Sequence, residues 1–98
     1  MAFIQIIEFQ TSRIDEMNAL IDQWLADTEG VRTSTRNIQA QDRDHPDSYI
    51  QIVEFPSYEE AMANSDRSET GQFAARMTAL CDGPLTYRNF DVTRSVLA

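Results

Sequence analysis

The strongest constraint on the fold is a hexapeptide that the chain contains in two nearly identical copies. Residues 4–9 read IQIIEF and residues 50–55 read IQIVEF. Both copies are rich in β-branched and aromatic residues, which predicts two β-strands. Because side chains alternate between the faces of a strand, each copy presents apolar residues on both faces. We therefore expect a sheet that is covered on both sides, with only one cover coming from this chain.

Each hexapeptide is followed by a signal for the start of a helix. Ser12 with Asp15, and Ser57 with Glu60, have the serine-x-x-acid spacing in which the hydroxyl accepts a hydrogen bond from a free backbone amide. The spacing predicts that both serines cap helices.

The two helical regions differ in regularity. Apolar residues at three- and four-residue intervals predict a first helix that ends near Gly30, a residue suited to the left-handed position after a helix. In the second region, residues 64–68 are polar and compete for backbone hydrogen bonds, so we expect a break or kink there. Gly83 and Pro84 should end this region.

The repeat continues after the helices, where Arg36-Asn37-Ile38 is matched by Arg88-Asn89-Phe90. These segments predict the second and fourth strands, and the polar residues 41–47 predict a hairpin loop between the halves. Two βαβ halves assemble most simply as one α+β domain over residues 1–98, a ferredoxin-like βαββαβ fold with a four-stranded antiparallel sheet. The first and third strands would be central, related by an approximate twofold axis. The apolar face without helices predicts a homodimer that packs sheet to sheet.

The composition argues against two classes of binding partner. The 98 residues carry a formal charge of −8, which repels phosphate backbones and anionic lipids, so we expect neither nucleic-acid nor membrane binding. No apolar run approaches the ~20 residues of a membrane span, and we recognise no secretory signal. The one cysteine, Cys81, cannot form an internal disulfide. We expect a soluble, cytoplasmic protein.

The strand and helix order, with YIQIVEFPSYEEAM (residues 49–62) leading from the third strand into a broken helix, resembles the dimeric α+β barrel superfamily and, within it, the antibiotic biosynthesis monooxygenase-like group. The resemblance implies a homodimer with a small-molecule pocket between sheet and helices. Some members oxygenate aromatic polyketide-type substrates without metal or flavin, and others have no demonstrated activity. Others degrade haem with an Asn, a Trp and a His on the second helix. This chain has neither Trp nor His there, which disfavours haem degradation.

Two residues are candidates for catalysis. Asn64, at the helix break, could direct its amide to an oxygen atom of a substrate, and Arg88, on the fourth strand, could stabilise an enolate or phenolate by its charge. Each has a structural alternative, because Asn64 could end the helix and Arg88 could pair with a carboxylate on the surface. Glu8 and Glu54, the acids of the repeat, need partners, and Arg36 and Arg88 are candidates.

Five further residues are candidates for binding a ligand, with core packing or strand-end packing as the alternative for each. They are Trp24, Tyr49, Phe73, Met77 and Tyr87.

We expect no metal and no cofactor. His45 is the only histidine, and its acidic neighbours lack the ligand order of a calcium loop, so a solvated hairpin is the better interpretation. The leading hypothesis is a cofactor-independent monooxygenase that acts on aromatic polyketide-like substrates. The alternative is a non-catalytic dimeric module that binds a ligand or a partner.

Overall fold

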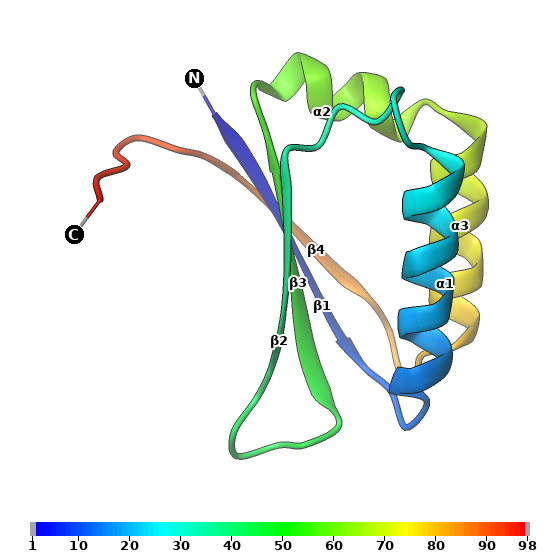
Figure 1. The fold of residues 1–98 in the computed structure, drawn as a ribbon. Coiled ribbons are helices and arrows are strands. Elements are labelled where there is room, and N and C mark those ends of the chain that lie inside the picture. Colours follow the sequence, from blue (N-terminus) through cyan, green and yellow to red (C-terminus); the bar gives the residue numbers. More distant parts are fainter. Residues whose placement is uncertain (1, 98) are drawn as a thin grey trace.

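The chain forms one antiparallel sheet with all of its helices on the same side (Figure 1). The computed structural model describes residues 2–97. The strands are β1 (Phe3–Gln10), β2 (Arg36–Gln41), β3 (Ser48–Phe55) and β4 (Thr86–Asp91), and the helices are α1 (Ile14–Asp27), α2 (Tyr58–Ser65) and α3 (Ser68–Ala79). The strands lie in the order β2-β3-β1-β4. This arrangement confirms the predicted four-stranded ferredoxin-like plan, with the second helix divided in two.

The repeated hexapeptides form the two central strands. β1 and β3 pair antiparallel, with Ile6 opposite Ile52. These two isoleucines are the third residues of the two hexapeptides. An approximate twofold axis therefore passes between Ile6 and Ile52, as the repeat predicted.

On the outer strands β2 and β4, the residues that the axis relates are not the residues that the sequence repeat aligns. Arg88 of β4 lies opposite Ile6, and Ile38 of β2 lies opposite Ile52. The axis therefore relates Arg88 to Ile38, and the predicted equivalence of Arg36 with Arg88 is wrong by two residues. Because a shift of two residues keeps a side chain on the same face, both arginines belong to the face without helices.

The other face of the sheet packs against the helices and forms the core. Strand alternation places Phe3, Ile7 and Phe9 of β1 on this face, together with Val53 and Phe55 of β3. The buried helix residues that complete the core are Met17, Ile21, Trp24, Ala61 and Met77.

The start of α1 differs from its prediction. The N-cap position is Arg13, which makes no side-chain cap, and Ser12 forms no capping hydrogen bond. The neighbouring buried residue Thr11 takes this place, because its hydroxyl accepts a hydrogen bond from the Arg13 amide (3.0 Å) and donates one to the Leu80 carbonyl (2.7 Å). Thr11 thus joins the start of α1 to the end of α3.

Three other predicted helix signals are confirmed, whereas the second helical region ends at Ala79, before the predicted end at Gly83 and Pro84. Gly30 has the left-handed φ of +82°, although α1 itself ends at Asp27. The Ser57 hydroxyl accepts a hydrogen bond from the Glu60 amide at 3.1 Å and caps α2. The second helical region breaks between Ser65 and Ser68, within the predicted stretch.

Two serines with the same sequence signal provide a matched test of these caps. Ser57→Ala should lower the free energy of unfolding by about 1 kcal/mol, because it removes the hydrogen bond to the Glu60 amide. Ser12→Ala should change it by less than about 0.5 kcal/mol, because Ser12 caps nothing. Urea denaturation at one fixed protein concentration measures both values. Equal losses for the two variants would contradict the assignment.

Candidate functional site

A cavity of about 230 Å³ lies between the sheet and the helices, beside the break that separates α2 from α3. Its floor comes from β1, β2 and β3, and its walls come from the three helices and Tyr87 of β4. Five of the seven predicted site residues line it: Trp24, Asn64, Phe73, Met77 and Tyr87. The cavity therefore brings together the residues that the sequence singled out on the helices.

Three side chains that line the cavity carry buried polar atoms without a hydrogen-bond partner among the described residues. They are the indole Nε1 of Trp24, the amide Oδ1 of Asn64 and the hydroxyl Oγ1 of Thr70. Trp24 is 6% exposed and Asn64 is 4% exposed. A buried polar group without a partner costs roughly 1–3 kcal/mol of stability. A ligand that hydrogen-bonds to these groups would recover this free energy.

Neighbouring groups hold the Trp24 ring in place. Phe73 packs against it with ring centroids 5.4 Å apart and planes inclined by 32°. The Arg32 guanidinium lies 5.7 Å from the ring centroid and donates a hydrogen bond to the Leu25 carbonyl (2.9 Å). The ring is therefore fixed between a helix and a cation, and the direction of its N–H group is set by the fold.

Amides on the sheet give the cavity a polar floor. Gln51 of β3 donates a hydrogen bond to Asn37 and accepts one from Gln39 at 3.2 Å. Gln5 of β1 donates to Asn89 at 3.1 Å. These amides already have partners, in contrast to Asn64, so the floor is ordered by the protein itself.

The side chains that line the cavity are all uncharged. Tyr87 is the one with a titratable group near its edge, and burial, followed by the charge of Cys81, raises the pKa of its phenol. Tyr87 therefore remains protonated at neutral pH and can donate a hydrogen bond. Burial, followed by the charge of Asp82, likewise raises the pKa of the Cys81 thiol, which lowers its reactivity.

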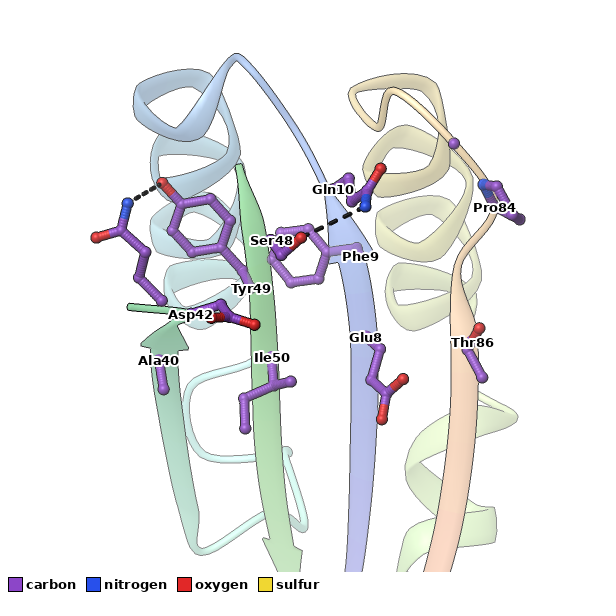
Figure 2. Close-up of a pocket in the computed structure, with 12 residues that line it drawn as sticks. Glu8, Phe9, Gln10, Ala40, Asp42, Ser48, Tyr49, Ile50, Pro84 and Thr86 are labelled. Atoms are coloured by element: carbon purple, nitrogen blue, oxygen red, sulfur yellow. Dashed lines mark hydrogen bonds between the residues drawn. The ribbon is translucent and has the colours of Figure 1, made fainter. Parts of the chain in front are cut away.

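Tyr49 belongs to a different depression, an open groove of about 630 Å³ at the end of the sheet where the β2–β3 hairpin lies. Figure 2 shows this groove with the helices behind the sheet and with Ala40, Ile50, Glu8 and Thr86 placed across the four strands. The Tyr49 ring stacks on Phe9 with centroids 5.7 Å apart, and its hydroxyl accepts a hydrogen bond from Gln41 (3.4 Å).

Arg88 lies on the face of the sheet opposite the cavity. Its Nη1 is 3.8 Å from Oε1 of Glu8, and its guanidinium is 5.0 Å from the centroid of the Phe90 ring. The structure thus gives Glu8 one of its two expected partners. The two residues proposed for catalysis, Asn64 and Arg88, are separated by the sheet.

Sequence reasoning missed the polar residues Thr70, Gln51 and Asn37 of the cavity. One signal could have found part of this set, because glutamine occupies the second position of both hexapeptides, among residues that face the helices. Thr70 lies in a polar stretch of α3 and carries no comparable signal.

The hairpin loop around His45 is exposed. The imidazole Nδ1 lies 3.5 Å from Oδ2 of Asp42, whose pKa is lowered by the backbone amide of Asp44 and by His45. Within residues 2–97, no group of three or more His, Cys, Asp or Glu side chains could hold a metal ion. No helix in this range is long and apolar enough to cross a membrane.

Solved structures with this architecture superpose closely on the chain. SnoaB, a cofactor-independent oxygenase from Streptomyces nogalater, matches in an asparagine-to-alanine variant with a TM-score of 0.82 and 14% identity, over 97% of this chain and 96% of SnoaB. An antibiotic biosynthesis monooxygenase matches with a TM-score of 0.74 and 15% identity, over 96% of this chain and 100% of that one. Rv0793 from Mycobacterium tuberculosis matches with a TM-score of 0.79 and 11% identity, over 99% and 100%.

No family model matches the sequence, and no curated protein matches it. Sequence identities of this size establish the fold and leave the activity to be tested. The chain thus shares the fold of SnoaB and of an antibiotic biosynthesis monooxygenase, in agreement with the resemblance seen in its sequence.

Proposed function

We propose that this protein binds a small aromatic molecule with an oxygen substituent in the cavity beside Asn64 and oxygenates it with dioxygen, without metal or flavin. The observation that carries the proposal is the set of unpartnered polar atoms, Trp24 Nε1, Asn64 Oδ1 and Thr70 Oγ1, in side chains that line one uncharged cavity. SnoaB, which shares the fold, is a cofactor-independent oxygenase, and this supports the same class of reaction.

The reaction has a defined balance for a phenol or its ketone tautomer. The phenolic O–H bond and the ring C–H bond para to it break, and that carbon forms a C=O bond with one atom of O₂. The second oxygen atom leaves as water with the two hydrogens. The substrate loses four electrons, and these reduce O₂. Electrons pass most readily from the phenolate, so the site must admit the neutral phenol and then stabilise the negative charge that develops on its oxygen.

Asn64 suits this requirement because an amide carries both an acceptor and a donor. Its Oδ1 can accept a hydrogen bond from the phenol, and rotation of the amide presents the NH₂ group to the phenolate. The Trp24 indole N–H donates to an oxygen of the substrate, and Phe73 and Met77 contact the ring. These fixed dipoles stabilise negative charge as it develops on the substrate.

The outer face of the sheet supports a second part of the proposal, a homodimer that packs sheet to sheet. The large apolar residues of this face are Ile4, Ile6, Ile38, Ile50, Ile52 and Phe90. Arg88 and Glu8 lie at the border of this apolar surface. Burying the surface against a second copy would remove it from water, and a twofold contact needs only one self-complementary face. We further propose that the dimer works in the cytoplasm, where Cys81 stays reduced.

The Asn64→Leu variant tests the chemistry. It should lower oxygen uptake with a panel of naphthols about 100-fold, because the substrate oxygen loses its amide partner. It should also raise the free energy of unfolding of the ligand-free protein by about 1 kcal/mol, because a buried amide without a partner is removed. An oxygen electrode and urea denaturation measure the two effects.

Two other outcomes would contradict this assignment. Loss of turnover in Arg88→Ala, with turnover retained in Asn64→Leu, would place the reaction on the outer face of the sheet. No oxygen uptake by the wild-type protein, with saturable ligand binding, would instead support the non-catalytic binding module.

The homodimer is tested by a charge placed on the outer face. Ile38→Glu should shift the protein from dimer to monomer in native mass spectrometry, because each interface would have to bury two unpaired carboxylates. Val31→Glu is the matched control, because Val31 is a similarly exposed apolar residue outside the sheet (46% against 37% for Ile38). A monomeric wild-type protein, or equal effects of the two variants, would contradict the proposed interface.

A further inference from the structure

We infer that the cavity selects an uncharged aromatic compound of two fused rings that presents a hydrogen-bond acceptor to Trp24, and that it rejects three-ring and anionic compounds. The inference rests on the proposed function for the location of the ligand, and it specifies which substrates this site takes. Three properties of the cavity carry it: its volume, its lack of charge and the fixed indole N–H.

The volume of the cavity sets the number of rings. A buried cavity of about 150 Å³ holds benzene, which has six carbon atoms. In the same proportion, the ten carbons of two fused rings need roughly 250 Å³ and the fourteen carbons of three fused rings need roughly 350 Å³. The cavity measures about 230 Å³. It therefore matches two rings, and a third ring would extend beyond its lining.

The lining of the cavity sets the charge of the ligand. Its side chains are all uncharged, and the acidic chain as a whole carries a formal charge of −8. The Arg32 guanidinium, which lies beside the Trp24 ring, donates hydrogen bonds from Nη1 to the Leu25 carbonyl and the Thr28 hydroxyl, and none of these three residues lines the cavity. A carboxylate in the cavity would lose its hydration without gaining a counter-ion, which is strongly unfavourable. Neutral compounds enter without this penalty.

The fixed indole sets the polar contact. Trp24 Nε1 can only donate a hydrogen bond, so its partner must be an acceptor such as a ketone or phenol oxygen. The Phe73 ring and the Arg32 guanidinium prevent the indole from turning away. Among neutral two-ring compounds, those with such an oxygen should therefore bind more tightly than the hydrocarbon.

Four compounds test separately the requirements for two rings, for a neutral ligand and for a hydrogen-bond acceptor. 1-Tetralone has two rings and a ketone, naphthalene has two rings and no acceptor, 1-naphthoate is an anion, and anthrone has three rings. Two NMR signals report binding: the indole N–H of Trp24, the single tryptophan of the chain, and the ¹³C-labelled methyl group of Met77, which lines the cavity. We expect 1-tetralone to bind about five-fold more tightly than naphthalene and to shift both signals. 1-Naphthoate and anthrone should bind at least about ten-fold more weakly than 1-tetralone.

The Trp24→Phe variant is the matched control for the donor, because it keeps an aromatic ring and removes the N–H group. It should weaken the binding of 1-tetralone about five-fold more than that of naphthalene, as read from the Met77 methyl signal. Equal weakening of both compounds would contradict the role of the indole as donor.

Failure of the inference and failure of the proposed reaction give different results. Oxygen uptake with anthrone, together with no shift on addition of 1-tetralone, overturns the two-ring limit and leaves the oxygenase proposal standing. Binding of 1-naphthoate as tight as that of 1-tetralone overturns the requirement for a neutral ligand. Binding in the expected order without oxygen uptake from any naphthol or anthrone supports the inference and contradicts the proposed reaction.

Discussion

The pairing of β1 with β3 about Ile6 and Ile52 is the constraint on which the rest of the structure depends. Because the two strands meet at equivalent positions of one hexapeptide, their odd-numbered residues share one face and their even-numbered residues share the other. A slip of one residue would exchange the faces and expose Phe3, Ile7 and Phe9 to water. The same register that buries this apolar set also places the amides of Gln5 and Gln51 under the helices, so the core and the floor of the cavity have a common origin.

The symmetry of the sheet does not extend to the helices, and this difference positions the cavity. α1 is continuous over Ile14–Asp27, whereas its counterpart is divided into α2 and α3. Between the sheet and the two longer helices, buried side chains form a cluster whose members Ile7 and Met77 also line the cavity: Ile7, Phe9, Met17, Ile21 and Met77. Beside the break, Asn64 and Thr70 leave polar atoms without partners. The cavity of about 230 Å³ therefore lies beside the half of the repeat whose helix is divided.

Much of the fold could be predicted from the sequence because its signals are local and occur twice. The hexapeptides identify the central strands, and the polar residues 64–68 identify the helix break. The signal at Ser12 was as strong as that at Ser57, and only Ser57 forms a cap. Local pattern could not separate the two, because the start of α1 is decided by Thr11 and its contact with Leu80, which is distant in the sequence. The mismatch of Arg36 with Arg88 has the same cause, since hydrogen bonding across the sheet sets the register of an outer strand.

The candidate site was predictable where helical spacing directs a side chain toward the sheet, as for Trp24, Phe73 and Met77. The site was less predictable on the strands, because the face on which a strand residue lies depends on which residue of the neighbouring strand is opposite it. Tyr87 and Arg88 are adjacent in the sequence, and the position of Arg88 opposite Ile6 sends one to the cavity and the other to the outer face.

The alternation of side chains along the strands also explains why the cavity lacks charged side chains and the other face of the sheet has them. The hexapeptide acids Glu8 and Glu54 and the arginines Arg36 and Arg88 all share the face of Ile6 and Ile52. On that face, water or a second copy of the chain can solvate the charges or pair with them, whereas beneath the helices each would have to be desolvated. The alternation of IQIIEF and IQIVEF thus places the two glutamates on the outer face and the two glutamines on the face that lines the cavity.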